Sequence, residues 1–293
     1  MKRLIFLFFI FLIPLVSAED CGLLNLASCI PQEFFNFLIN ILNSPLQPLL
    51  DLTRSLITEP IELSAFASLW AIILYILSIF YGLLMFYSGF NFIISGYDSA
   101  KRAKAKEWFM NIFIMIVLIQ ASYFLYSLFI DIGSYLTIGM MDLVDPNFFL
   151  LTADNMVNIG LQFFFVLLYV IVLIFTTLFL TLRYLIVASG VVFVPIGIFL
   201  YFIPPVREYG KLILNFLAIC IFITLIDSLI ILISSQLINI SLFANFKILV
   251  MISTFLVANF LMFYFMFFSA IKSALRTAER TAIPIMAVAK YFI

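Results

Sequence analysis

The sequence predicts an all-α, polytopic membrane protein with about five transmembrane helices and one re-entrant or broken helical segment. Hydrophobic residues make up 66% of the 293 residues, and only 10% are charged. Soluble domains carry roughly 25% charged and 45–50% apolar residues. The apolar stretches are separated by short charged loops, and several exceed the roughly 20 residues that a helix needs to cross a bilayer. Composition and pattern therefore both indicate an integral membrane protein.

The first 18 residues have the pattern of a secretory signal peptide. Lys2 and Arg3 precede an apolar run at 4–16, and Ser17-Ala18 follow it. The apolar run is short for a membrane span. We therefore expect cleavage near Ala18, and the alternative is a retained first helix.

Residues 19–63 are expected to lie outside the cytoplasm. Pro45 and Pro48 break their apolar clusters, which predicts two short amphipathic helices on the outer membrane surface. The alternative is that these helices pack against the transmembrane bundle. Cys21 and Cys29 also fall here, where disulfides can persist. A Cys21–Cys29 bridge and two free thiols both fit this spacing.

The transmembrane domain is expected at 64–271, followed by a basic, amphipathic cytoplasmic tail at 272–293. The five predicted spans lie at about 64–95, 108–133, 156–182, 212–238 and 248–271.

The broken segment is expected at 184–205, between the third and fourth spans. Proline removes a backbone donor and clashes with the preceding helical turn. Broken backbone at membrane depth needs protein or a water cavity to cover it. We therefore expect two re-entrant or surface-lying half-helices that do not cross. They are expected at the inner face near the axis of an oligomer, where their apolar side chains form a constriction or a lipid-filled collar. Packing within their own subunit is the alternative. The residues concerned are Phe193, Pro195, Ile196, Gly197, Phe199, Pro204 and Pro205.

The distribution of basic residues predicts the orientation, because short cytoplasmic loops are enriched in Lys and Arg. With five crossings, the basic loop at 101–106, the residues around 207–211 and the tail share one face. The prediction is a multi-pass protein of the cytoplasmic membrane, with the mature N-terminus outside and the C-terminus in the cytoplasm. Contact with anionic lipid or a cytoplasmic partner is expected for Lys101, Arg102, Lys104, Lys106, Arg207 and Lys211.

Three ionisable residues fall within the predicted spans, where such residues are candidates for function. Asp131 lies roughly 36 Å along a helix from Glu107, which predicts a solvated helix end at the outer interface. Arg183 is expected at the inner face, where it reaches the interface or anchors the broken segment. Asp227 is expected within the membrane core, in a helix–helix hydrogen bond or a wet cavity.

Catalytic, cofactor-binding and metal sites are not expected. The sequence has no His, no cysteine pattern typical of zinc and no phosphate-binding glycine loop. It also offers no nucleophile–base pair. These observations predict a protein that is not an enzyme.

Two stretches carry a resemblance to a known family. They are SGFNFIISGYDSAKRAKAKEW and PIGIFLYFIPPVREYGKLILNFL, which accompany a signal-like start and a short outer segment before five spans. With them the chain resembles the TrbL/VirB-type polytopic inner-membrane subunits of type IV secretion and conjugation machines, including the archaeal Ced-type DNA-import relatives.

The resemblance implies a membrane-embedded structural or channel subunit of a conjugation, DNA-transfer or pilus-base machine. It further implies a homo-oligomeric ring, expected to be pentameric, beside a cytoplasmic ATPase and a small pilin-like membrane subunit. Membrane lipids and single- or double-stranded DNA in transit complete the implied partners. A stand-alone transporter or channel for a small solute is the alternative function, and a membrane enzyme or assembly factor is the third.

Overall fold

The computed structural model describes residues 46–149, 159–240 and 246–268, together with residues 37, 44, 243 and 271. These residues form helices and turns and contain no strand, which confirms the all-α class. The predicted signal peptide, Cys21, Cys29 and the tail lie outside the described residues.

Within the described ranges, five helices are long and apolar enough to cross a membrane, in agreement with the predicted number of spans. Short 3-10 turns join α3 to α4 (η2, Ser95–Tyr97) and α5 to α6 (η5, Pro204–Val206). A π-helical turn, Tyr264–Phe268, follows the last helix. The five helices are α3 (Ala67–Ile94), α4 (Ser99–Met141), α5 (Ile159–Phe202), α6 (Arg207–Ile238) and α8 (Lys247–Phe263).

The segment expected to be broken is instead part of one continuous helix. α5 runs from Ile159 to Phe202 with Pro195 inside it. Pro195 cannot donate to the carbonyl of Val191, but Val191 is fully buried, so protein covers the freed carbonyl. The chain turns only at Ile203, whose extended backbone is the conformation favoured before a proline. The prediction of a re-entrant pair of half-helices at 184–205 is therefore wrong, and this segment extends the third span.

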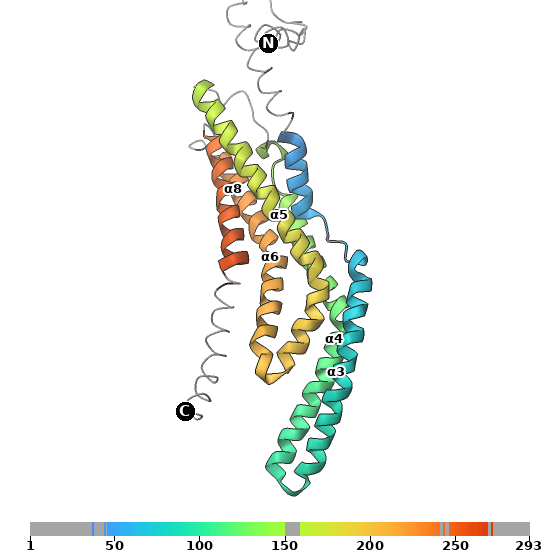
Figure 1. The fold of residues 1–293 in the computed structure, drawn as a ribbon. Coiled ribbons are helices and arrows are strands. Elements are labelled where there is room, and N and C mark those ends of the chain that lie inside the picture. Colours follow the sequence, from blue (N-terminus) through green and yellow to red (C-terminus); the bar gives the residue numbers. More distant parts are fainter. Residues whose placement is uncertain are drawn as a thin grey trace, which may run out of the picture.

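The helix at 46–58 packs against the bundle. Its Thr53 and Ile57 are buried, and the Oγ1 atoms of Thr53 and Thr177 of α5 lie 2.9 Å apart. Figure 1 shows this helix beside the upper part of α5. For these residues the expected position on the membrane surface is wrong, and the alternative of packing against the bundle is confirmed.

The helices α3 and α8 lie at different heights along α5. Phe80 of α3 contacts Phe199, near the C-terminal end of α5, with ring centroids 5.8 Å apart. Phe263 of α8 contacts Phe179, in the other half of α5, at 6.2 Å. The two helices therefore follow each other along the long axis of the molecule, with α8 above and α3 below in Figure 1.

Two cores hold the bundle together. The larger lies between α5, α6, α8, the C-terminal half of α4 and the helix at 46–58. The smaller lies between α3 and the N-terminal half of α4, around Leu77, Tyr81 and Ile119. The turns 95–98 and 203–206 both lie toward the lower end in Figure 1. We call this end, with the basic residues at 101–106 and 207–211, the basic end.

Candidate functional site

Arg183 is buried in the middle of α5 and joins this helix to α6. Its side chain is 5% exposed. Nε donates to the carbonyl oxygen of Cys220 at 2.8 Å, and a terminal nitrogen donates to that of Ile221 at 3.1 Å. Because α5 continues to Phe202, Arg183 does not lie at a helix end. Its expected place at the end of the third span is wrong, and the two carbonyls that it bonds to belong to α6. Its position relative to the membrane faces stays a prediction.

Asp227 lies on the buried face of α6, two turns beyond the carbonyls that Arg183 contacts, and is 1% exposed. Among the described residues, neither of its carboxylate oxygens has a hydrogen-bond partner. The charge of Arg183 acts on it electrostatically, but no ion pair closer than 4.0 Å joins the two described side chains. Of the two environments expected for Asp227, the helix–helix hydrogen bond is not formed among the described residues. The wet cavity and the depth of Asp227 in the membrane stay predictions.

Tyr126 joins α4 to the same region. Its hydroxyl donates to the carbonyl oxygen of Val187 at 2.6 Å. The hydroxyl end of the Tyr126 ring packs against α5 because residue 190 is glycine. A Cβ at this position would collide with the Tyr126 hydroxyl and would lie 2.8 Å from Cδ2 of Leu217. Three helices are thus tied together within one turn of Arg183, so we call Arg183, Asp227 and Tyr126 the buried polar site.

Asp131 lies inside α4, which continues to Met141. It is half-buried, and its carboxylate accepts a hydrogen bond from Ser127 at 3.4 Å. The prediction of a solvated helix end is wrong, because α4 is longer at both ends than its apolar run indicates.

A cleft at the basic end brings together residues that are far apart in the sequence. It has a volume of about 420 Å³ and lies between α4 and the turn that joins α5 to α6. We call it the basic cleft. It is lined by Lys104, Glu107, Trp108, Asn111, Tyr201, Phe202, Pro204 and Arg207. Of the predicted contact residues, Lys104 and Arg207 meet here.

The remaining predicted contact residues lie around this cleft. Lys101 lines an adjoining cleft that Lys104 and Trp108 share, and its Nζ lies 3.8 Å from Asp98. The guanidinium of Arg102 lies 5.7 Å from the centre of the Phe92 ring. Lys106 is exposed, and Lys211 pairs with Glu208 at 3.0 Å.

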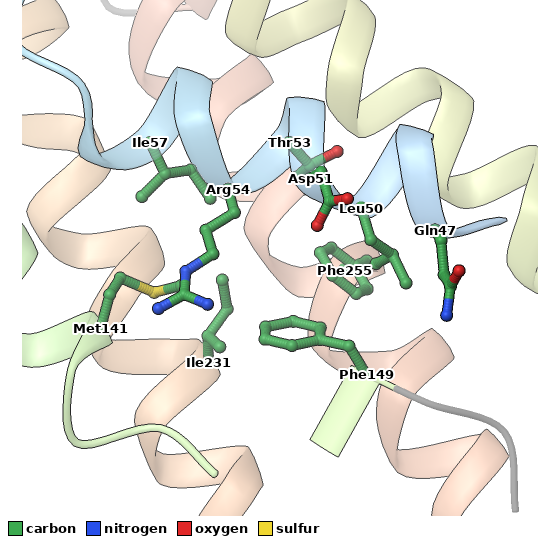
Figure 2. Close-up of a pocket in the computed structure, with 10 residues that line it drawn as sticks. All are labelled: Gln47, Leu50, Asp51, Thr53, Arg54, Ile57, Met141, Phe149, Ile231 and Phe255. Carbon is green, nitrogen blue, oxygen red and sulfur yellow. The ribbon is translucent and has the colours of Figure 1, made fainter. Parts of the chain in front are cut away.

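The opposite end holds a pocket that the sequence reasoning missed. It has a volume of about 230 Å³. Figure 2 shows Arg54 reaching toward Met141, with the rings of Phe149 and Phe255 beside it. The sequence does indicate the packing face of the helix at 46–58: Leu46, Leu50, Thr53 and Ile57 are spaced by three and four residues, which places them on one side of a helix. The lining residues are Gln47, Leu50, Asp51, Thr53, Arg54, Ile57, Met141, Phe149, Ile231 and Phe255.

The residues expected to form a constriction lie in different environments. Phe193 is 48% exposed, whereas the Phe199 ring packs on Phe80 of α3. Ile196 is half-buried and Pro195 buried, and Gly197 faces Ile213 and Leu214 of α6. Pro204 and Pro205 are exposed at the turn. The constriction concerns an oligomer and stays a prediction.

The part of the chain that the structure describes contains no group of three His, Cys, Asp or Glu residues that could hold a metal ion. The described residues contain two other features: the buried Arg183, which joins α5 to α6, and the positively charged basic cleft. The fold and these sites define a multi-pass helical membrane protein. No family model, curated protein or solved structure matches the chain.

Proposed function

We propose that this chain is a membrane-embedded structural subunit of a type IV secretion-like machine that serves conjugation, DNA transfer or a pilus base. One observation carries the first part of this proposal: α3 and α8 follow each other along the molecule. α3 is about 42 Å long, and α8 with its π-helical turn is about 33 Å long. The hydrocarbon core of a bilayer is about 30 Å thick.

A flat bilayer core of about 30 Å therefore cannot cover both helices in full when they stand upright, and part of one apolar helix is left outside the hydrocarbon. Both helices expose large apolar side chains, such as Ile72, Phe86 and Ile93 on α3 and Phe260 on α8. Each Å² of apolar surface left in water costs about 25 cal/mol. Neighbouring protein subunits can cover such a surface, and a subunit of a large assembly has these neighbours.

The particular machine rests on the resemblance of the two sequence stretches around residues 88–108 and 195–217. Within it, the exposed Lys106 and its basic neighbours suit a cytoplasmic ATPase, and the apolar faces suit further copies of the chain and a pilin-like subunit. The proposed location is the cytoplasmic membrane, with the basic end in the cytoplasm.

Co-purification tests the proposal. A tagged chain is extracted from native membranes in mild detergent after brief cross-linking, and its partners are identified by mass spectrometry. We expect several copies of the chain together with an ATPase and a small membrane protein, and loss of DNA transfer on deletion. A single copy that purifies without partners would contradict the proposal.

The alternative, a stand-alone transporter, is favoured by the buried carboxylate of Asp227 beside the charge of Arg183. Intramembrane charges of this kind mark ion and proton pathways in transporters. Ion or proton flux into vesicles that contain only the purified chain, lost in Asp227→Asn, would support this alternative.

Cysteine substitutions test the orientation and the constriction. A membrane-impermeant reagent applied from outside is expected to label cysteines at Asn147 and Phe243 but not at Lys104 and Tyr209. For the constriction, Phe193→Cys is expected to cross-link between subunits. Phe199→Cys, which α3 covers, serves as the control. Cross-links from α8 positions without any from position 193 would remove the constriction from the proposal.

A further inference from the structure

We propose that the basic cleft binds the phosphate headgroup of an anionic phospholipid. The cleft draws its positive charges from two separate elements, Lys104 of α4 and Arg207 at the start of α6. About a hundred residues separate Lys104 and Arg207 in the sequence. The packing of the α5–α6 turn against α4 therefore brings them to the same cleft.

Arg207 is held in place at the cleft. Its terminal nitrogen donates to the Tyr201 hydroxyl at 3.1 Å, and its guanidinium lies 4.8 Å from the centre of the same ring. A guanidinium has five N–H donors, so one bond to Tyr201 leaves donors for a ligand. Glu208, the neighbouring acid, already pairs with Lys211 at 3.0 Å.

Glu107 is the acid that lines the cleft, against the two cations. Among the described residues, no ion pair closer than 4.0 Å joins Glu107 to Lys104 or Arg207. Arg207 also opens α6, and the positive end of a helix dipole favours an anion nearby. The cleft therefore keeps a net positive charge that its own acid does not cancel by direct pairing.

Neutral donors add to the charges. The indole nitrogen of Trp108 is buried and has no hydrogen-bond partner among the described residues. A buried N–H without an acceptor costs free energy, and Trp108 lines the basic cleft together with the Asn111 amide. A phosphate group in the cleft offers acceptor oxygens to the Asn111 amide, and the Trp108 N–H gains one when its indole turns toward the ligand.

The surroundings favour a lipid over a free anion. Phe202, Tyr201 and Trp108 give the cleft apolar and amphipathic walls. Tryptophan and tyrosine gather at the membrane interface, and basic pockets between transmembrane helices bind anionic headgroups. The cleft thus combines two cations with apolar and amphipathic walls.

The test measures the thermal unfolding of the purified full-length chain in neutral detergent. Phosphatidylglycerol, phosphatidylcholine, inorganic phosphate and a polyglutamate peptide are each titrated. We expect phosphatidylglycerol alone to raise the unfolding temperature in a saturable way. Lys104→Gln/Arg207→Gln is expected to weaken its apparent affinity at least ten-fold. The control Arg102→Gln/Lys106→Gln removes the same charge outside the cleft and should change the affinity less than two-fold.

Several results would overturn the proposal. One is a rise in unfolding temperature with phosphatidylcholine, inorganic phosphate or the peptide that equals the rise with phosphatidylglycerol. Another is an equal loss of affinity in the control variant, which would indicate diffuse charge attraction. If the cleft variant does not fold in phosphatidylcholine, Trp108→Phe replaces it, because phenylalanine keeps an aromatic ring without the N–H. We expect Trp108→Phe to weaken the affinity about three-fold, and an unchanged affinity would contradict the role of the indole.

Discussion

The α5–α6 and α3–α4 hairpins have the same plan, two long apolar helices joined by a 3-10 turn, but they pack by different means. Glycines let the α5 and α6 backbones approach closely: a Cβ at Gly210 would lie 2.6 Å from the carbonyl oxygen of Gly197. In the other hairpin, a Cβ at Gly82 or Gly89 would meet no described atom within 4 Å. Large side chains such as Tyr81 fill the contact between α3 and α4.

The glycines have the same seven-residue spacing in both helices, at Gly82 and Gly89 and at Gly190 and Gly197. This spacing places both glycines of a pair on one face of a helix. It does not determine whether that face meets another helix or the surroundings. Spacing in a sequence therefore predicts a shared face, and only the packed structure identifies what the face contacts.

Side-chain hydrogen bonds between the helices also differ between the two hairpins. The α5–α6 hairpin uses Arg183 to bond two carbonyls of the facing helix. Among the described residues, buried polar atoms without a partner occur in both hairpins, at Tyr81, Ser88 and Trp108 in α3–α4 and at Tyr169 and Asp227 in α5–α6. Trp70 bonds to Ser122 at 3.0 Å near the upper end of the α3–α4 hairpin. The hairpins therefore differ in the bonds between their helices: Arg183 alone makes two across α5–α6, against the one that Trp70 makes across α3–α4.

The largest expected effect in this comparison comes from removing Arg183, which joins α5 to α6 by two hydrogen bonds. Arg183→Met removes two charge-assisted hydrogen bonds, each worth about 1.5–3 kcal/mol, and leaves Asp227 without its nearby positive charge. We expect a loss of about 3 kcal/mol in the free energy of unfolding, measured by SDS titration in micelles. Arg183→Met/Asp227→Asn should lose less than the sum of the two single variants, because coupled neighbours are not additive. Additive losses would show that the two residues act independently.

The second prediction compares the glycines with one substitution. Gly210→Ala places a methyl group against the backbone of Tyr201 and Gly197, and such overpacking costs about 1–3 kcal/mol. Gly89→Ala meets open space and removes a helix-destabilising glycine, for a gain of about 0.5–1 kcal/mol. Thermal unfolding in the same detergent measures both. Equal effects at the two positions would mean that the hairpins do not differ in backbone packing.

The number of spans was predictable from the sequence because apolar length and charged loops determine it. The continuity of α5 was not, because proline and glycine were interpreted as helix breaks. Pro195 is tolerated since Val191 is buried, and Gly190 provides room for the Tyr126 ring. Both are properties of neighbouring helices. The basic residues of the cleft were predicted as contact residues. That Lys104 and Arg207 line the same cleft depends on how the two hairpins pack, which the periodicity of the sequence does not encode.

The smallest expected effect compares two buried tyrosines. The Tyr126 hydroxyl donates to the carbonyl oxygen of Val187, so Tyr126→Phe is expected to cost about 1 kcal/mol. The Tyr81 hydroxyl is buried without a partner among the described residues, so Tyr81→Phe is expected to be neutral or stabilising, because it removes an unsatisfied polar group. Both variants delete one oxygen and keep the ring, so unfolding in the same micelles isolates the hydrogen bond. A larger loss from Tyr81→Phe would mean that its hydroxyl has a partner in the membrane, and that the α3–α4 hairpin is bonded more tightly there than the isolated chain indicates.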